Sequence, residues 1–263
     1  MELDIYQIDA FASKPFEGNP AAVVPLKHWL TDGQMQQIAS ENNLSETAFY
    51  VNESDGYRIR WFTPADEVPL CGHATLAAAY VLFKLNPGLD EIRFQSLSGP
   101  LIVSRDGDQI TMDFPVSPVV PLKTPSLLLE ALGAAPNECV KSVDGRRYIA
   151  VFDDQDQIIN LTPNISKFTA LDAMTVTVTS PSQKYDFISR VFAPKLGIPE
   201  DPVTGALHTS LIPLWAEKLG KNKLYAKQVS SRGGELHCEL KGERTFISGT
   251  AVEYLRGTIS IPD

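Results

Sequence analysis

The stretch Phe62-Thr63-Pro64-Ala65-Asp66-Glu67-Val68-Pro69-Leu70-Cys71-Gly72-His73-Ala74-Thr75 decides the fold of this chain, because a later stretch repeats its plan. The second copy reads Phe192-Ala193-Pro194, then Glu200-Asp201, then Thr204-Gly205-Ala206-Leu207-His208. In both copies a strand-like segment ends in Phe-x-Pro, a Glu stands five residues before a Gly, and an apolar helical segment follows. The repeat predicts a duplicated fold with two helix N-termini, each carrying unpaired N–H groups and partial positive charge. If both ends face one cleft, they form a site for a small anion such as a carboxylate.

Length, composition and charge indicate a soluble globular protein and argue against a nucleic-acid-binding one. The 263 residues suit one large domain or two of about 130 residues each. The chain is 43% apolar and 21% charged, which is ordinary for a soluble globular protein. Its net charge of -9 argues against a nucleic-acid partner, because neutralising phosphates requires clustered Lys and Arg.

Cysteine usage and the N-terminal sequence predict a cytoplasmic protein. Cys71, Cys139 and Cys238 are three in number and widely spaced, which fits neither a disulfide framework nor a zinc motif. Free thiols are typical of a reducing cytosol. We expect no signal peptide, because the chain begins with strand-like sequence, and no membrane span, because no apolar run reaches 18 residues.

The hydrophobic pattern predicts an α+β fold of two similar halves. We assign residues 1–116 to the first half and 117–263 to the second, and we leave open a return of the last strand to the N-terminal domain. A proline-rich segment near 115–125 separates them, since proline cannot continue a sheet interior. Strands are predicted at 3–11, 21–25, 47–51, 57–63, 91–96, 100–105, 109–114, 147–152, 173–179, 185–192, 224–230, 235–240 and 244–256.

Helices are predicted at about 31–42, 72–85, 125–132 and 205–219. The first opens with a capping box at Thr31 and Gln34. The segment 72–85 is apolar on all sides, and such a helix is buried. We therefore expect each half to be a mostly antiparallel, barrel-like sheet around a central buried helix.

Glu46 is the first candidate for chemistry. It stands between a helix end and an apolar strand in Asn43-Leu44-Ser45-Glu46-Thr47-Ala48. An isolated Glu is usually a surface residue in a turn. The functional interpretation is that apolar neighbours raise the pKa of this carboxylate, so that it moves protons near neutral pH.

His73, Glu200 and Asp201 stand beside the two helix starts. A helix N-terminus lowers the pKa of an imidazole, so we expect His73 to be neutral and able to relay a proton. Alternatively, it merely fills the first turn. The two acidic residues either favour the second helix dipole or take part in chemistry.

Cys71 raises the possibility of a racemase with two opposed thiol bases. A thiol just before a helix N-terminus has a tendency to ionise. The matching residue in the second copy is Thr204, whose hydroxyl is too weak an acid for that role. Cys71 is therefore interpreted as structural or as a small residue beside the substrate.

Taken in order, six short motifs resemble the PhzF-like, phenazine-biosynthesis-type isomerase family over nearly the whole chain. They run from Asp9-Ala10-Phe11 and Phe16-x-Gly18-Asn19-Pro20-Ala21-Ala22-Val23, through Asn43–Ala48, Phe62–Thr75 and Glu200–Gly205, to Ser248-Gly249-Thr250-Ala251.

The resemblance implies a fold similar to diaminopimelate epimerase, with the site in a cleft between two pseudo-symmetric domains. It also implies a homodimer, no metal and no organic cofactor. The family's catalytic Glu, His and Asp match Glu46, His73 and Asp201. Substrate-binding positions match Asn19, Ser45, Gly72, Gly205 and Ala206. Ala206 departs from the family, which has a Ser there, so a hydroxyl is lost near the substrate.

These features predict a cofactor-independent isomerase that shuttles a proton on a small carboxylate. Glu46 removes and returns the proton, His73 and Asp201 assist, and the amides at Gly72 and Gly205 hold the carboxylate. Two alternatives remain: a cysteine-based racemase or epimerase, and a catalytically silent binding protein on the same scaffold.

Overall fold

The computed structural model describes residues 1–262 and divides the chain into two compact units. The first unit is Met1–Phe114 with Phe246–Asp263, and the second is Pro115–Thr245. Segment 246–263, which the sequence-based boundary counted in the C-terminal half, thus groups with the first unit. The reason is strand pairing, because β18 runs antiparallel to β1 along its whole length.

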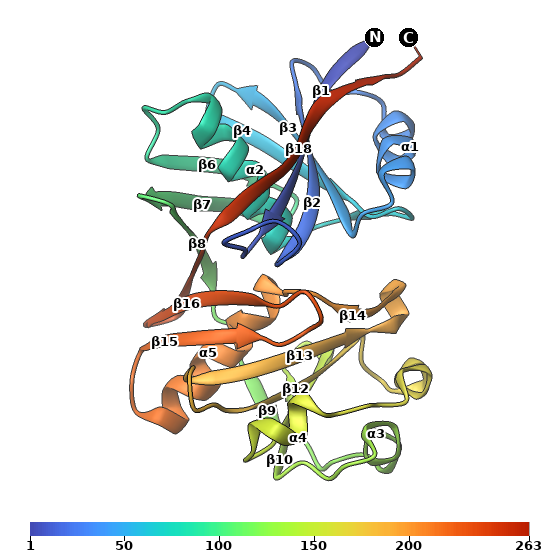
Figure 1. Cartoon of the computed structure of the whole chain (residues 1–263), viewed down its shortest axis with the longest axis vertical. Helices are drawn as coiled ribbons and strands as arrows, with labels where there is room; N and C mark the ends of the chain where they lie inside the picture. Colours follow the sequence, from blue (N-terminus) through green and yellow to red (C-terminus); the bar gives the residue numbers. More distant parts are fainter. Residues whose placement is uncertain (263) are drawn as a thin grey trace. The chain divides into compact units, whose positions relative to one another are not determined.

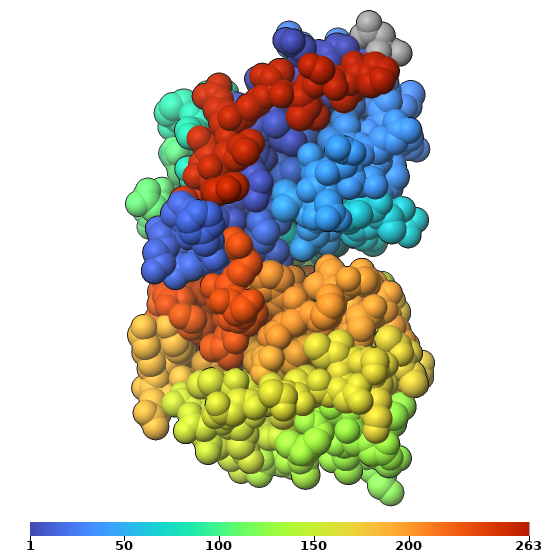
Figure 2. All heavy atoms as spheres, turned by 45° about the vertical axis from the view of Figure 1, so that its right-hand side comes forward, coloured from blue at the N-terminus to red at the C-terminus, as the bar shows by residue number. Residues whose placement is uncertain are grey.

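In the first unit a mostly antiparallel sheet surrounds helix α2 (Figure 1). Its elements are β1 (Glu2–Ala10), β2 (Asn19–Leu26), α1 (Asp32–Asn42), β3 (Glu46–Glu53), β4 (Gly56–Phe62), β5 (Glu67–Val68), α2 (Gly72–Leu85), β6 (Glu91–Ser96), β7 (Gly99–Asp106), β8 (Gln109–Pro115) and β18 (Ala251–Ser260). At the surface, β18 lies beside the N-terminal strand (Figure 2).

The second unit repeats this plan around helix α5. Its elements are β9 (Val119–Pro121), α3 (Ser126–Leu132), β10 (Glu138–Ser142), β11 (Arg147–Val151), α4 (Gln155–Ile159), the 3-10 helix η1 (Ile165–Ala170), β12 (Thr175–Pro181), β13 (Phe187–Ala193), the 3-10 helix η2 (Pro194–Leu196), β14 (Ile198–Asp201), α5 (Gly205–Leu219), β15 (Lys223–Gln228) and β16 (Gly234–Lys241). Strand β17 (Arg244–Gly249) leads the chain back to the first unit.

Strand pairing follows the same order in both units. In the first, β1–β2 is antiparallel, β2–β3 parallel, β3–β4 and β4–β5 antiparallel, β4–β6 parallel and β6–β7 antiparallel. In the second, β10 to β16 pair with the same alternation. Strand β18 pairs with β1 as β9 pairs with β10. The predicted duplication is therefore confirmed at the level of topology, with the last strand completing the first unit.

Helix α2 is buried because its residues are apolar on every side. Between Gly72 and Phe83 only Tyr80 is not fully buried. Helix α1 covers the other face of the sheet, where Met35, Ile38 and Ala39 pack against strand residues such as Val24 and Phe49. The predicted capping box of α1 is present, since Thr31 and Gln34 exchange hydrogen bonds. Because α2 covers one face of the sheet and α1 the other, strands β2 and β3 are buried over most of their length.

Several short elements were missing from the sequence-based prediction. Strand β9 lies within the proline-rich segment that we predicted to be a linker, where it pairs with β10 at the edge. Strands β5 and β14 have two and four residues, too few for a readable alternation. The single strand predicted over 244–256 is two strands, β17 and β18, separated at Thr250. Among the described residues, no helix is both long and apolar enough to cross a membrane.

Candidate active site

Two of the predicted site residues, Glu46 and His73, face each other in the first unit. Glu46 is the first residue of β3, and His73 is the second residue of α2. The His73 Nε2 lies 3.1 Å from the Glu46 Oε2, and only 6% and 13% of these side chains are exposed. A carboxylate and an imidazole this close form an ion pair or share a proton.

The other ring nitrogen of His73 contacts two more side chains. The amide Nδ2 of Asn19 lies 3.3 Å from the His73 Nδ1, and the Cys71 Sγ lies 3.5 Å from the same atom. Parallel pairing sets Ala21 of β2 opposite Glu46 of β3, so Asn19 lies at the same strand end as Glu46. Of the predicted residues, the first unit thus brings Asn19, Glu46 and His73 together, with Cys71 beside them.

Electrostatics in this cluster differ from the sequence-based expectation. Burial raises the pKa of the Cys71 thiol to about 11, so the thiol keeps its proton at neutral pH. Burial by itself lowers the pKa of His73, but the Cys71 sulfur and the Glu46 carboxylate raise it more, and the pKa lies well above the usual value. The raised pKa runs against the expectation of a neutral His73, because the contacts with Cys71 and Glu46 outweigh burial.

Ser45 and Gly72, both predicted to contact substrate, lie next to this cluster along the chain. Ser45 is half-buried and directly precedes Glu46. Gly72 is buried and begins α2, and Cys71 before it provides no side-chain cap to the helix. The first N–H groups of α2 therefore lie beside the Glu46–His73 pair and are suited to an anion.

The remaining predicted residues belong to the second unit. Asp201 ends β14, and its Oδ2 accepts a 2.5 Å hydrogen bond from the hydroxyl of Thr204. Thr204 precedes Gly205 and Ala206, the first residues of α5. Sequence reasoning missed Gln228, which is completely buried. Its Oε1 accepts from the Thr204 N–H at 2.9 Å, and its Nε2 donates to the Asp201 carbonyl at 2.6 Å. Gln228 thus holds the start of α5 in place.

The duplicated acidic residues Glu67 and Glu200 have a structural role. Each forms a two-pronged ion pair with an arginine on the preceding strand. Arg60 donates to Glu67 at 2.7 and 2.6 Å, and Arg190 donates to Glu200 at 2.8 and 2.9 Å. Each guanidinium also lies over a phenylalanine ring two residues further along its strand, at 5.1 and 5.2 Å. The pairs therefore fix the loop that leads to each central helix.

Each central helix makes an equivalent hydrogen bond in its first turn. The Thr75 hydroxyl donates to the Cys71 carbonyl at 2.5 Å, and the matching His208 places its Nδ1 2.8 Å from the Thr204 carbonyl. Burial lowers the pKa of His208 to about 4, so this ring is neutral. We interpret His208 as part of the helix start rather than as an acid or base.

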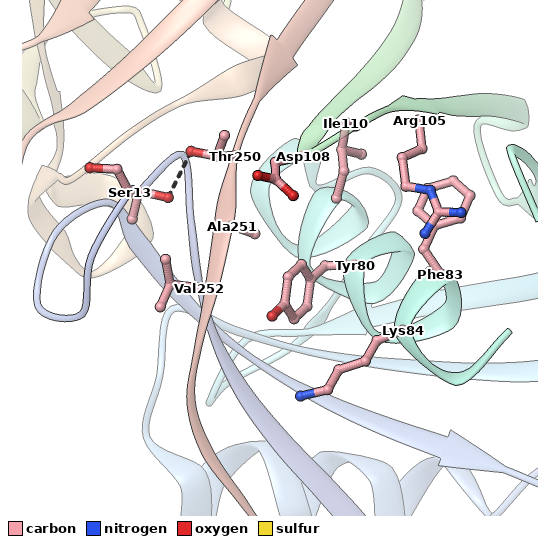
Figure 3. A pocket seen from close by; sticks show the side chains of 12 residues that line it. Ser13, Tyr80, Phe83, Lys84, Arg105, Asp108, Ile110, Thr250, Ala251 and Val252 are labelled. Atoms are coloured by element: carbon pink, nitrogen blue, oxygen red, sulfur yellow. Dashed lines mark hydrogen bonds between the residues drawn. The ribbon is translucent and has the colours of Figure 1, made fainter. Parts of the chain in front are cut away.

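A sizeable cavity in the first unit does not contain the predicted residues. It has a volume of about 560 Å³ and lies in the first unit beside Tyr80 and Lys84 of α2. In Figure 3, Asp108 and Ile110 line one side and Thr250 to Val252 line another. The Arg105 side chain that borders it is held by the carbonyls of Pro87 and Leu89, at 2.9 and 2.8 Å. Nothing in this cavity resembles a proton-transfer pair.

Sequence comparison identifies the group of proteins to which these features belong. Residues 8–257 match the family described as PhzC-PhzF, phenazine biosynthesis-like protein. The chain belongs to this family. It is 52% identical to an uncharacterized isomerase of Pseudomonas aeruginosa, over 99% of this chain and all of that one. A relative named uncharacterized isomerase in Halalkalibacterium halodurans is 44% identical, with 98% and 99% covered. The predicted resemblance is confirmed, and the chain is an isomerase of the PhzF type.

Solved structures agree with the PhzF assignment. A PhzF-family protein of Enterococcus faecalis superimposes with a TM-score of 0.96 at 44% identity, covering 99% of this chain and 100% of that one. A hydroxyproline epimerase of Agrobacterium vitis is similar in fold, with a TM-score of 0.64, 10% identity and coverages of 100% and 93%. The predicted epimerase-like α+β fold is confirmed.

Proposed function

We propose that this PhzF-family protein is a cofactor-independent isomerase that moves a proton between two positions of a small carboxylate. The observation that carries the proposal is the Glu46–His73 pair, 3.1 Å apart and largely buried at the start of α2. Glu46 is the general acid–base: its ionised carboxylate accepts a proton from a substrate carbon and returns it at another position. The bond broken and the bond formed are both C–H bonds, so the step needs no redox partner.

His73 supports this step through its charge. Because its pKa is raised, the ring holds its proton to higher pH than a free imidazole does, and its Nε2 lies 3.1 Å from the Glu46 Oε2. A protonated imidazole stabilises the carboxylate while it is ionised and the substrate's developing negative charge while Glu46 holds the proton. The Cys71 sulfur lies 3.5 Å from Nδ1, where it can accept from the Nδ1–H and orient the ring.

We further propose that the starts of α2 and α5 hold the substrate's carboxylate. Both helices begin with Gly after a residue that provides no side-chain cap, namely Cys71 and Thr204. Charge near one helix start is worth about 0.3–1 kcal/mol when exposed and up to about 2 kcal/mol when partly buried. Asp201 assists from the second unit. Ala206, next to Gly205, offers no hydroxyl to the substrate, which sets this chain apart from relatives with Ser there.

The thiol racemase is disfavoured by two contacts. The Cys71 thiol is held protonated by burial, and the Thr204 hydroxyl already donates to Asp201. In the cell, we propose a cytoplasmic homodimer. The buried, unpaired state of Cys71, Cys139 and Cys238 supports a reducing compartment, and the dimer rests on the family resemblance.

A substrate screen tests the proposal. Hydroxy, amino and cyclic diene carboxylates are incubated with the protein in heavy water, and deuterium uptake is followed by mass spectrometry and NMR. The account predicts uptake at carbon for at least one class of carboxylate. A broad screen in which compounds bind, as judged by thermal shift, but none exchanges would instead support the silent binding protein.

A further inference from the structure

The cluster around His73 contains donor atoms of three kinds. Glu46 offers a carboxylate oxygen, Cys71 a sulfur and His73 a ring nitrogen, and one such atom from each lies within 4.8 Å of the other two. Sulfur, imidazole nitrogen and carboxylate oxygen are the ligands that Zn²⁺ takes in proteins.

The arrangement needs little movement to close on a metal ion. Zn–S and Zn–N bonds of about 2.3 and 2.0 Å place tetrahedral donors about 3.3–3.8 Å apart. The His73 Nδ1 is already 3.5 Å from the Cys71 Sγ, and Glu46 lies on the other side of the ring at 3.1 Å from Nε2. One donor atom from each of the three side chains already lies within 4.8 Å of the other two, so closing to this spacing takes side-chain movements of about 1 Å. The backbone positions that carry them, the end of β3 and the first turn of α2, are fixed by strand pairing and helix packing.

Burial favours such a site. The Glu46 and His73 side chains are 13% and 6% exposed, and Cys71 is 6% exposed. An ion bound there exchanges water ligands for protein ligands in a place where few water molecules compete. Three protein donors leave a fourth tetrahedral position for water or a substrate carboxylate.

We propose that Glu46, Cys71 and His73 form an inhibitory binding site for Zn²⁺ or a similar soft divalent ion. Binding replaces the thiol proton of Cys71 and the ring proton of His73 with the metal, and both protons go to solvent. The Glu46 lone pair that accepts the substrate proton is then donated to the ion. The inhibitory consequence rests on the proposed function, whereas the binding itself does not.

Binding is tested first without any substrate. Metal-stripped protein is titrated with Zn²⁺ by calorimetry, and with Co²⁺ as a spectroscopic probe, because a cobalt–thiolate bond gives an intense ultraviolet charge-transfer band. We expect one Zn²⁺ per chain and a thiolate band with Co²⁺. Cys71→Ser, which keeps the size of the side chain, weakens Zn²⁺ binding by more than about 100-fold, beyond the 10–100-fold typical of residues that only support ligands. The thiolate band is lost as well.

Matched controls are Cys139→Ala and Cys238→Ala, which remove buried, unpaired thiols elsewhere in the chain. Both leave Zn²⁺ affinity and the cobalt band unchanged. Wild-type protein that does not bind Zn²⁺, or a Cys71→Ser variant that binds it equally well, overturns the proposal. If Cys71→Ser fails to fold, the cobalt titration is repeated on a Cys139→Ala/Cys238→Ala double variant, in which Cys71 is the one remaining thiol. A cobalt–thiolate band in this variant supports the site, and its absence overturns it.

A second arm tests inhibition once a substrate has been found. One equivalent of Zn²⁺ abolishes deuterium exchange in the wild type, and a chelator restores it. Zn²⁺ that binds through Cys71 but leaves exchange unchanged, or increases it, overturns the inhibitory role. A chain with no isomerase activity that still binds Zn²⁺ through Cys71 refutes the proposed function and leaves the metal site intact.

Discussion

The His208→Thr substitution isolates the effect of one buried histidine on stability. In the first unit the matching residue is Thr75, whose hydroxyl makes the same hydrogen bond to the carbonyl that precedes the helix. The variant therefore keeps a donor for the Thr204 carbonyl but removes the titrating ring. It also removes volume from a site that is completely buried, so we expect a loss of about 1–3 kcal/mol at neutral pH.

The pH dependence follows from the sign of the shift. Burial lowers the pKa of His208 from 6.5 to about 4, so between these values the unfolded chain binds one more proton than the folded chain. The stability that the neutral ring preserves is present above about pH 6.5 and is lost as the pH falls toward 4. At about 1.4 kcal/mol per pKa unit, the loss is about 1.4 kcal/mol at pH 5.5, about 2.5 kcal/mol at pH 4.5 and about 3.4 kcal/mol in full.

The assay is urea denaturation of both proteins across this pH range. Other groups titrate in the same window, among them His73, whose raised pKa contributes with the opposite sign: its stabilisation is complete below about pH 6.5 and is lost at higher pH. We therefore compare the wild type with the variant. The difference in unfolding free energy between wild type and variant is constant above about pH 7 and shifts by about 2.5 kcal/mol in favour of the variant by pH 4.5. A difference that does not change with pH would show that His208 is not held neutral by burial, and would refute the reasoning.

Three further predictions concern the residues around the site. Glu67→Gln and Glu200→Gln each weaken a half-buried ion pair with an arginine, so each lowers the free energy of unfolding by about 1–3 kcal/mol in urea titrations. Deuterium exchange per folded molecule stays within a few-fold of the wild-type rate. Loss of exchange without loss of stability would give these two residues a chemical role. Because burial raises the Cys71 pKa to about 11, Cys71→Ala retains substantial exchange activity and native protein resists thiol alkylation, and a folded but inactive variant would favour the racemase. Gly18 has a positive φ of 66°, and a Cβ there would lie 2.1 Å from the Ala10 carbonyl oxygen, so Gly18→Ala lowers the free energy of unfolding by more than about 2 kcal/mol. Gly107 has a φ of 58° and open space around it, so Gly107→Ala lowers it by about 1 kcal/mol. Equal losses in urea titrations would contradict the steric argument.

Much of the fold can be predicted from the sequence because its signals are local. The helix 72–85 is apolar on every side, which is enough to bury it, and the repeated Phe-x-Pro and Gly positions mark both helix starts. The pairing of β18 with β1 has no local signal, since the partners stand at opposite ends of the chain. Strand β9 is hidden for another reason: prolines flank it, and proline is tolerated only where a strand lies at an edge.

In the candidate site, too, local sequence motifs can be predicted and contacts between distant segments cannot. Glu46 and His73 are predicted from their motifs, and the structure brings them to 3.1 Å. The direction of the His73 pKa shift is not predicted correctly, because it depends on contacts with Cys71 and with the Glu46 carboxylate that only the folded chain makes. Gln228 is missed because an isolated Gln at the end of a strand carries no pattern, although its amide joins Asp201 to Thr204. Contacts between distant segments decide both features.

The central claim, that Glu46 moves the proton, is tested most directly by the rate of deuterium exchange into substrate by Glu46→Gln. The substitution is nearly isosteric, so the fold is retained and the ring of His73 keeps a hydrogen-bond partner. The matched control is Glu53→Gln, which lies exposed at the far end of the same strand, about 23 Å away along β3. We predict that Glu46→Gln lowers the exchange rate per folded molecule by about 10²–10⁴-fold, while Glu53→Gln exchanges at the wild-type rate. A folded Glu46→Gln variant that exchanges as fast as the wild type would contradict the account.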